Sequence, residues 1–355
     1  MTQLNILPRT EAPKAANDSR AKKVLSPLQV KNLLPVPEEI MASVEHSKQQ
    51  IRDILNGKDD RLLVVTGPCS IHDEAAALEY GQKLAELNKK LSDKLLIVMR
   101  TYVEKPRTSV GWKGFAYDPV RDGCGNMEQG LLRSRKLMLQ LAQLGLPLAT
   151  EALNPLVMMY MDDVISWVAI GARTSESQTH REMVSNLDIP VGIKNNTNGS
   201  ADTAINAMIS AGHSHHTLGL NRHGEIAMID TPSNPDTHLV LRGGKTATGE
   251  VITNYDEKSI EEAVATLTDK NVHTKLMIDC SHDNAQKQHL KQIDIALHVA
   301  QLKRKGNQNI LGIMLESFIE EGKQSMDGKL VYGKSITDAC ISWNQTEKLL
   351  NCLTV

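Results

Sequence analysis

Positive charge is concentrated in one short stretch of the sequence, residues 100–114, which has the sequence RTYVEKPRTSVGWKG. The stretch follows the apolar run Leu95–Met99, so it begins where a predicted strand ends. Its cations are Arg100, Lys105, Arg107 and Lys113. Guanidinium groups pair bidentately with phosphate and carboxylate, so this spacing favours an anionic, phosphorylated ligand. A solvated basic loop is the alternative interpretation.

A wider pattern supports the ligand site: polar or reactive side chains stand at or just past the ends of eight apolar runs. They are Cys69, Arg100, Glu151, Arg173, Lys194, Arg242, His282 and Glu316. Any one of them has a structural explanation, but stability does not require all eight, and ordinary connections would mix in Gly, Asn, Ser and Pro. Together they predict a single functional site.

The candidate residues divide into two chemical groups. A cationic group large enough for two phosphates and a carboxylate contains Arg100, Lys105, Arg107, Arg173, Lys194, Arg242 and Lys245. A ligand group of sulfur, nitrogen and oxygen contains Cys69, His282, Glu316 and Asp338. This mixture suits a divalent transition metal (Mn²⁺, Fe²⁺, Co²⁺ or Zn²⁺) better than Mg²⁺ or Ca²⁺, which prefer oxygen. A packed cysteine and a hydrogen-bonded histidine are the alternatives.

The elements that must position these residues follow a repeating pattern of buried-looking strand and amphipathic helix. Strands are expected at 62–66, 95–99, 146–150, 168–171, 191–193, 238–241, 276–278 and 311–315. Helices are expected at 26–34, 38–55, 74–91, 128–144, 155–166, 200–211, 256–269 and 284–305, with Ser200 and Asn284 as N-caps. Eight strand–helix units predict an α/β fold, a (β/α)8 TIM barrel, with its chemistry at the strand ends. A doubly wound sheet is the alternative, but no GxGxxG follows the first strand.

Two segments lie outside the eight units. The runs His216–Asn221 and Glu225–Asp230, joined by a short turn containing glycine, predict a β-hairpin inserted at about 214–232. Residues 1–56 are expected to form an N-terminal arm and helix for oligomerisation or regulation, and residues 57–355 the catalytic barrel.

Composition excludes several function classes. Forty basic and 42 acidic residues give a formal charge of −2, and aromatic residues make up 3% of the 355. Neither value favours binding to nucleic acid or to an anionic membrane. No apolar run reaches the roughly 18 residues of a membrane span, and the polar N-terminus lacks the apolar segment of a signal peptide. Five cysteines without CxxC spacing indicate reduced thiols, so we expect a cytoplasmic protein.

Six motifs carry a resemblance to a known family: GPCSIHD (67–73), RTYVEKPRTSVGWKG (100–114), GARTSESQTHRE (171–182), LRGGK (241–245), IDCSH (278–282) and YGKSITDACISW (332–343). From about Ser26 to the C-terminus the chain resembles the class I (type Iα, microbial) 3-deoxy-D-arabino-heptulosonate 7-phosphate (DAHP) synthases, the tyrosine-sensitive isoenzymes most. This resemblance implies a metal-dependent transferase that condenses phosphoenolpyruvate, erythrose 4-phosphate and water to DAHP and phosphate, opening the shikimate pathway.

The resemblance also implies roles for individual residues. The metal ligands would be Cys69, His282, Glu316 and Asp338. Phosphoenolpyruvate would meet Arg100 and Lys105 at its carboxylate and Arg173, Lys194 and Arg242 at its phosphate, with Glu151 and Ala172 close by. Erythrose 4-phosphate would contact Lys105, Pro106, Arg107 and Thr108. Lys105 and His282 are competing acid–base candidates beside Cys69, and the metal would either polarise the aldehyde or hold the attacking water.

Regulation is a further implication of the resemblance. An aromatic amino acid would bind beside the hairpin, at Met158, Asp188, Thr217 and Gly219, with Asp18 from a neighbouring subunit's arm. Gly219 favours tyrosine over phenylalanine, and loss of regulation is the alternative. A homodimer or homotetramer is expected, and a Cys69–Cys340 disulfide is expected to inactivate oxidised metal-free protein.

Two other functions remain open on sequence alone. The first is a related phosphoenolpyruvate-condensing synthase that takes arabinose 5-phosphate, which the KPRT run at 105–108 disfavours. The second is a non-catalytic barrel that binds phosphorylated metabolites, which the complete ligand set disfavours.

Overall fold

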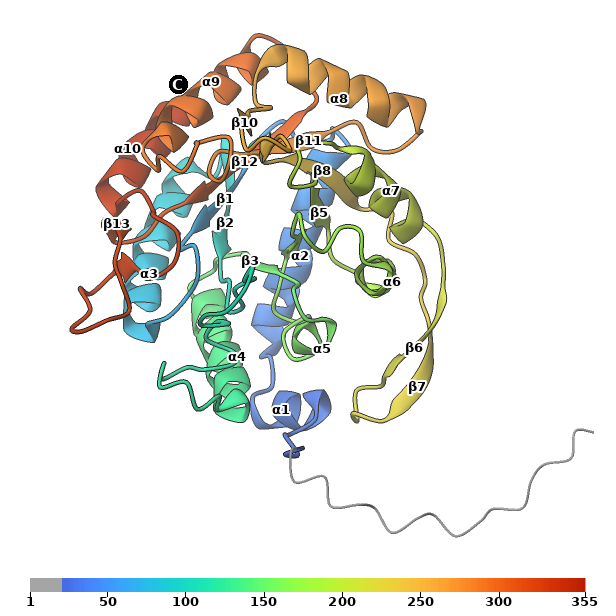
Figure 1. Cartoon of the computed structure of the whole chain (residues 1–355), viewed down its shortest axis with the longest axis vertical. Coiled ribbons are helices and arrows are strands. Elements are labelled where there is room, and N and C mark those ends of the chain that lie inside the picture. The colour runs from blue at the N-terminus through green and yellow to red at the C-terminus, as the bar shows by residue number, and fades with distance from the viewer. Residues whose placement is uncertain (1–20, 355) are drawn as a thin grey trace, which may run out of the picture.

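A closed barrel of eight parallel strands forms the centre of the protein (Figure 1). The computed structural model describes residues 21–354. The barrel strands are β1 (Leu62–Gly67), β2 (Leu95–Arg100), β3 (Leu148–Glu151), β4 (Trp167–Ile170), β5 (Val191–Lys194), β8 (Thr237–Leu241), β11 (Leu276–Asp279) and β12 (Ile310–Glu316). Each of the eight predicted runs is a strand, and β12 pairs with β1 to close the sheet. The predicted (β/α)8 barrel is confirmed.

The barrel strands read as continuous apolar runs because both of their faces are covered. Alternate side chains of β1 enter different cores: Leu63 and Val65 lie in the cluster inside the barrel, whereas Leu62 and Val64 lie in the cluster between strands and helices. All residues of β1 are buried. The apolar core is therefore divided into an inner and an outer layer.

Eight helices follow the barrel strands within the described residues: α3 (Glu74–Leu91), α4 (Met127–Gln143), α5 (Pro155–Met158), α6 (Gln178–Asn186), α7 (Asp202–Ala211), α8 (Glu257–Asp269), α9 (Lys291–Arg304) and α10 (Trp343–Leu353). Four predicted segments match α3, α4, α7 and α8 within two residues.

Other helix predictions need correction. α5 ends at Met158 instead of residue 166, and α9 starts at Lys291 instead of residue 284. Helices α6 and α10 were not predicted. Neither Ser200 nor Asn284 is an N-cap. The buried amide of Asn284 instead donates to the Leu241 and Asp279 carbonyl oxygens and supports the loop after β11.

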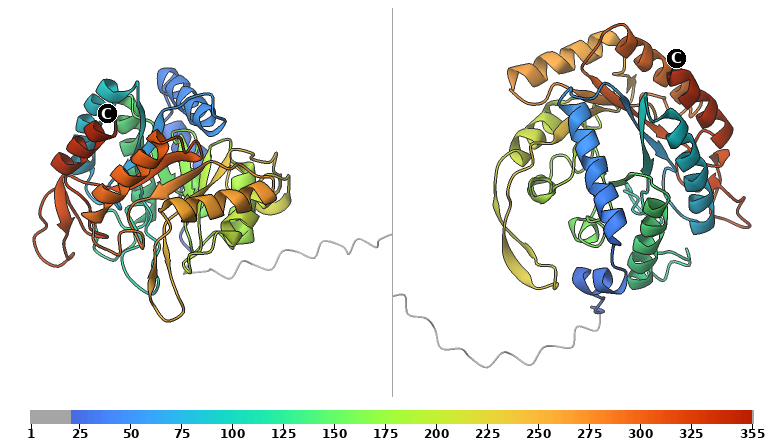
Figure 2. Two further views of the ribbon diagram at one scale, coloured as in Figure 1. Left: turned by 90° about the horizontal axis from the view of Figure 1, so that it is seen from above. Right: turned by 180° about the vertical axis from the view of Figure 1, so that it is seen from behind.

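Two helices precede the barrel, α1 (Pro27–Leu33) and α2 (Glu38–Leu55). Figure 2 shows α2 lying across one end of the barrel. Its residues Ile51, Ile54 and Leu55 belong to the same apolar cluster as the inward-facing strand residues. The helix therefore closes the end at which the strands begin and leaves their carboxyl ends for the site.

The inserted hairpin consists of the antiparallel strands β6 (His216–Leu220) and β7 (Ile226–Asp230). It stands outside the barrel (Figure 1). In its turn, the Arg222 carbonyl accepts a hydrogen bond from the Leu28 amide. Short strands form two further pairs, β9 (Gly244–Lys245) with β10 (Val251–Ile252) and β13 (Glu320–Lys323) with β14 (Lys334–Ser335). Among the described residues, no helix combines the length and apolarity needed to cross a bilayer.

Candidate active site

One cavity of about 260 Å³ lies at the carboxyl ends of the barrel strands. Its walls include every residue that the family resemblance assigned to a metal, a substrate or catalysis: Cys69, Arg100, Lys105, Pro106, Arg107, Thr108, Glu151, Ala172, Arg173, Lys194, Arg242, His282, Glu316 and Asp338. Lys245, which the sequence placed in the cationic group, is not among them and lines a neighbouring cavity instead. The barrel brings them together because parallel strands end at the same rim. What the structure adds is the contacts between them.

The deep wall of the cavity is cationic. Arg100 is 1% exposed, and its guanidinium carbon lies 3.9 Å from the centre of the Tyr102 ring. Arg100 Nη2 also lies 3.4 Å from Glu316 Oε1. Burial alone would lower the pKa of Arg100, but the surrounding Tyr102 and Glu316 raise it, so the charge is retained. This wall therefore offers a fixed positive charge to an anion.

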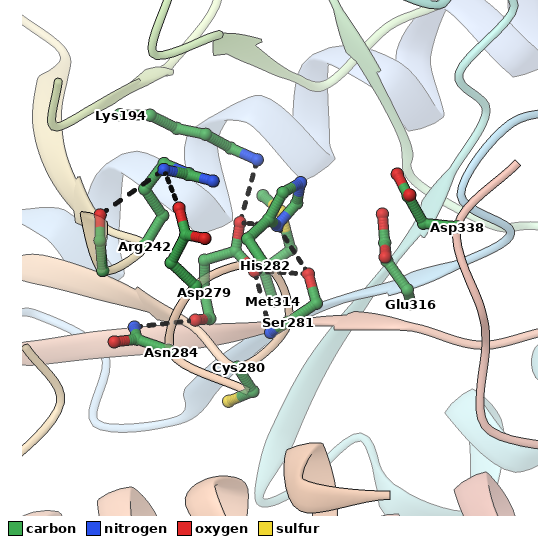
Figure 3. Close-up of polar contacts among 12 residues, drawn as sticks. Lys194, Arg242, Asp279, Cys280, Ser281, His282, Asn284, Met314, Glu316 and Asp338 are labelled. Carbon is green, nitrogen blue, oxygen red and sulfur yellow. Dashed lines mark hydrogen bonds and ion pairs between the residues drawn. The ribbon is translucent and has the colours of Figure 1, made fainter. Parts of the chain in front are cut away.

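Two further cations on this wall are each held by a carboxylate (Figure 3). Lys194 Nζ donates to Asp279 Oδ2 at 2.9 Å, and Arg242 Nη1 lies 2.8 Å from Asp283 Oδ2. Lys194 is buried, whereas Arg242 is partly exposed. The carboxylates orient the cations while leaving their other donors for a ligand.

Towards the rim, the cavity is lined by more exposed side chains. Arg107 Nε donates to the Trp112 carbonyl at 2.7 Å, and Arg173 Nη2 donates to Thr108 Oγ1 at 3.2 Å. Arg107, Thr108 and Arg173 are all exposed. The cavity thus has two cationic regions at different depths, enough for two phosphorylated molecules.

Three of the four predicted metal ligands form a cluster. The ligand atoms of Cys69, Glu316 and Asp338 all lie within 4.8 Å of one another. Burial raises the pKa of the Cys69 thiol to about 12, and the Glu316 carboxylate adds to the shift. Burial alone would raise the pKa of Asp338, but Lys105 holds it well below its usual range. One thiol and two carboxylates therefore meet at one point of the wall.

The Lys105 ammonium lies within this cluster. Its Nζ is 2.7 Å from Asp338 Oδ2 and 3.1 Å from Cys69 Sγ. Burial alone would lower the pKa of Lys105, but Cys69, Asp338 and Glu316 together raise it above its ordinary value. The donors thus already accommodate one positive charge, which is the property that a metal site requires.

The fourth predicted ligand, His282, lies outside that three-residue cluster. Figure 3 shows it beside Asp279 and Lys194, with Glu316 and Asp338 on its other side. Its Nδ1 lies 2.9 Å from Asp279 Oδ2 and 2.6 Å from Ser281 Oγ. The backbone of His282 has φ 54°, a left-handed conformation that histidine, asparagine and aspartate adopt more readily than other residues with a side chain.

Sequence reasoning missed three residues that complete the site. Tyr102 and Glu104 line the cavity, and Asp279 lies behind it, holding Lys194 and His282. Tyr102 and Glu104 fall between the predicted cations, in a segment, 101–104, that is buried throughout. Its sequence has no periodic pattern that would mark these two residues. Asp279 ends a strand, so the rule that identified Glu151 and Glu316 would also have identified it.

Glu104 is a buried carboxyl group, 3% exposed. Its Oε1 accepts a hydrogen bond from the Tyr117 hydroxyl at 2.9 Å, and Oε2 accepts one from the Asn154 amide at 3.3 Å. Burial raises the pKa of Glu104 to about 7, and Glu151 contributes to the shift. The cavity therefore contains a carboxyl group that changes charge near neutral pH.

The predicted effector residues do not line this cavity. Thr217 and Gly219 lie on β6, and Thr217 Oγ1 donates to Glu182 Oε2 of α6 at 2.6 Å. Met158 is buried at the end of α5. Asp188 pairs with Arg52 of α2 at 2.5 Å. The fifth residue, Asp18, lies outside the described part of the chain.

Taken together, the site combines fixed cations, a soft and hard donor cluster and a lysine ammonium between them. Cations of this kind bring two anionic molecules together by offsetting their repulsion, and a donor cluster of this type binds a Lewis-acidic metal. The arrangement is suited to joining two phosphorylated substrates.

Comparison with known proteins agrees with this chemistry. The model of the DAHP synthetase I family matches residues 38–351. The chain is 47% identical to the Tyr-sensitive phospho-2-dehydro-3-deoxyheptonate aldolase of Escherichia coli (strain K12), over 92% of this chain and 91% of that protein. It is 45% identical to the Phe-sensitive enzyme of the same strain, over 94% of each chain.

A solved structure gives the same result. The phospho-2-dehydro-3-deoxyheptonate aldolase from Francisella tularensis SCHU S4 superposes with a TM-score of 0.91 at 41% identity. The superposition covers 95% of this chain and 98% of that chain.

Proposed function

Because this chain belongs to the DAHP synthetase I family, we propose that it condenses phosphoenolpyruvate with erythrose 4-phosphate and water, giving DAHP and phosphate. The observation that carries the proposal is the single cavity in which two cationic regions flank the Cys69, Glu316 and Asp338 donors. A binding protein for phosphorylated metabolites would need the cations but not the donor cluster.

In this proposal the two substrates occupy different depths. Phosphoenolpyruvate binds the inner wall, with its carboxylate at Arg100 and Lys105 and its phosphate at Lys194 and Arg242. The exposed Arg173, nearer the rim, reaches the same phosphate from above. Erythrose 4-phosphate binds nearer the rim, at residues 105–108. Support comes from exposure, since Arg100 and Lys194 are buried whereas Arg107 and Thr108 are exposed.

Lys105 is the residue best placed to act on the reacting atoms. It joins the two proposed regions, and the negative groups around it keep it protonated. Attack by C3 of phosphoenolpyruvate on the sugar aldehyde generates an alkoxide, and an ammonium at this position donates the proton. His282 is the competing acid.

The residues present fit a divalent transition metal. Cys69, His282, Glu316 and Asp338 would hold it, since thiolate and imidazole favour such ions over Mg²⁺ or Ca²⁺. The bound ion would supply Lewis-acid chemistry at a substrate oxygen. Mn²⁺, Fe²⁺, Co²⁺ and Zn²⁺ are all compatible with this donor set.

The proposed reaction is tested by the loss of phosphoenolpyruvate absorbance on addition of erythrose 4-phosphate. We expect consumption that stops with EDTA and returns with Mn²⁺. Arabinose 5-phosphate in place of erythrose 4-phosphate is the matched control for the related synthase activity. No consumption with fresh metal and reduced thiols would contradict the proposal.

We also propose feedback inhibition by an aromatic amino acid, tyrosine in preference to phenylalanine, in a cytoplasmic homodimer or homotetramer whose residues 1–56 take part in assembly. Support comes from the names of the relatives, which include Tyr-sensitive and Phe-sensitive enzymes, and from the hairpin that carries Thr217 and Gly219. Initial rates with each amino acid test the effector, and light scattering after size exclusion tests the assembly.

A further inference from the structure

One buried carboxylate, Asp279, contacts both halves of the site. It is the last residue of β11 and is 0% exposed. Its Oδ2 lies 2.9 Å from Lys194 Nζ, in the cationic wall, and 2.9 Å from His282 Nδ1 (Figure 3). No substrate or metal role was assigned to it above.

The other oxygen of Asp279 is fixed by its neighbour. Oδ1 accepts hydrogen bonds from the Ser281 amide at 3.0 Å and from Ser281 Oγ at 2.7 Å. A carboxylate can only accept, so the single hydroxyl proton of Ser281 is directed to Asp279. Ser281 Oγ therefore faces His282 Nδ1, 2.6 Å away, as an acceptor.

This network assigns the proton on the His282 ring. Both atoms that face Nδ1 are acceptors, Asp279 Oδ2 and Ser281 Oγ, so Nδ1 must carry a proton. Nε2 of the neutral ring is then the nitrogen with a free lone pair. A metal-binding histidine commonly donates its second ring N–H to a carboxylate, which fixes the ring orientation and strengthens the ligand.

From this geometry we infer that Asp279 is a positioning residue for His282: it holds the imidazole in the tautomer that leaves Nε2 free to bind a metal, and it balances the charge of Lys194 beside it. The inference rests on the proposed metal site.

Replacement of Asp279 by asparagine keeps the size of the side chain but removes its negative charge and one hydrogen-bond acceptor. The Ser281 amide is an obligate donor, so the oxygen of an asparagine would occupy the Oδ1 position. The NH2 group would then face Lys194 and His282, where only acceptors are tolerated. His282 Nδ1 would have to accept a hydrogen bond, and the proton would move to Nε2.

The test measures Co²⁺ binding to the metal-free full chain by the absorbance of the cobalt–thiolate complex, without turnover. We expect Asp279→Asn to weaken Co²⁺ binding by about 10- to 100-fold. Asp283→Asn is the matched control, because Asp283 lies in the same loop as His282 but its carboxylate is paired with Arg242. Its Co²⁺ affinity should stay close to wild type. Equal affinity in the two variants, or equal loss, would overturn the inference.

A second experiment measures the protonation of the His282 ring directly by NMR. It needs no variant at position 279, so it also tests the inference if Asp279→Asn does not fold. In metal-free wild-type protein with ¹⁵N-labelled histidine, the neutral ring of His282 should show a proton on Nδ1 and none on Nε2. His282→Gln assigns its signals among the 12 histidines. A proton on Nε2 would overturn the inference. Wild-type turnover is measured separately, so its failure would count against the proposed reaction and not against Asp279.

Discussion

Lys105 Nζ lies 3.1 Å from Cys69 Sγ, inside the group of donors proposed to bind a metal. The same ammonium donates to Asp338 at 2.7 Å. The side chain proposed to protonate the alkoxide therefore contacts the proposed metal ligands. Removal of the Lys105 side chain should affect proton transfer but leave the metal ligands in place, so the two roles can be measured separately.

Replacement of Lys105 by alanine should lower turnover at saturating substrates by about 10²- to 10⁴-fold, the usual contribution of a general acid. Mn²⁺ binding should be retained, because the thiol and both carboxylates remain. Rates of phosphoenolpyruvate consumption and equilibrium dialysis of Mn²⁺ measure the two effects. Turnover near wild type would exclude Lys105 as the acid and leave His282.

Metal binding should release a proton from Cys69. Since burial raises the pKa of this thiol to about 12, it is protonated at neutral pH and must lose its proton to bind as thiolate. We expect the apparent Zn²⁺ affinity to rise about tenfold per pH unit for each proton released. A pH indicator in weakly buffered solution measures the release. Cys69→Ser should release one proton fewer, and an unchanged release would contradict the prediction.

Glu104 should make stability depend on pH. Its pKa is about 7 in the folded protein, above the ordinary value of 4.5, so folding favours the protonated form. Protonated Glu104 contributes to the free energy of unfolding below pH 4.5. This contribution, at most about 3 kcal/mol, is lost as the pH rises to 7. Relative to Glu104→Gln, the wild type should lose unfolding free energy over this window. Urea unfolding at pH 5 and 7.5 measures it, and a constant difference would be inconsistent with the pKa.

A side chain at position 171 should displace the Glu151 carboxylate. A Cβ at this position would overlap the Glu151 carboxylate and push it out of place. We expect Gly171→Ala to lower kcat/KM by about 100-fold, as small displacements at active sites do. Gly212→Ala is the control, because its Cβ would meet no atom closer than 3.4 Å. Similar kcat/KM values for the two variants would refute the argument.

Oxidation of the metal-free protein should inactivate it through Cys69 and Cys340. Both are buried, and the Cys340 thiol lies 3.6 Å from the Asp338 carbonyl, next to the donor cluster. Burial raises the pKa of both thiols, so oxidation should be faster at higher pH. Cys340→Ser should resist inactivation. Full activity of oxidised wild type after metal is restored would rule out this disulfide.

The barrel could be predicted because its strands carry the simplest signal, an uninterrupted apolar run. The helix boundaries were harder where contacts outweigh local preference. Residues 155–166 look helical, but Arg135 is fully buried and binds the Tyr160 carbonyl and Asp163, which stops the helix early. Helix α10 could have been predicted from the capping-box pattern Ser-x-x-Gln at 342–345, and these two residues form the reciprocal hydrogen bonds of that motif.

The site could be predicted as a set of residues but not as a network. Reading strand ends located the cavity, since parallel strands bring their ends together. Residues 284–290, in the loop after β11, are predicted as helix from the sequence because the left-handed residues Gln286 and Lys287 are not glycines. The partners of a histidine depend on distances across that loop, and no spacing in the sequence encodes them.

Because α2 closes the end of the barrel at which the strands begin, ligands enter and leave past the carboxyl ends. The buried Arg100 and Lys194 lie beneath the exposed Arg107 and Thr108 along that route. A sugar phosphate held at the outer pair would stand in the path of the molecule destined for the inner pair. If the two substrates bind as proposed, phosphoenolpyruvate must enter before erythrose 4-phosphate, and excess sugar phosphate should compete with its own co-substrate.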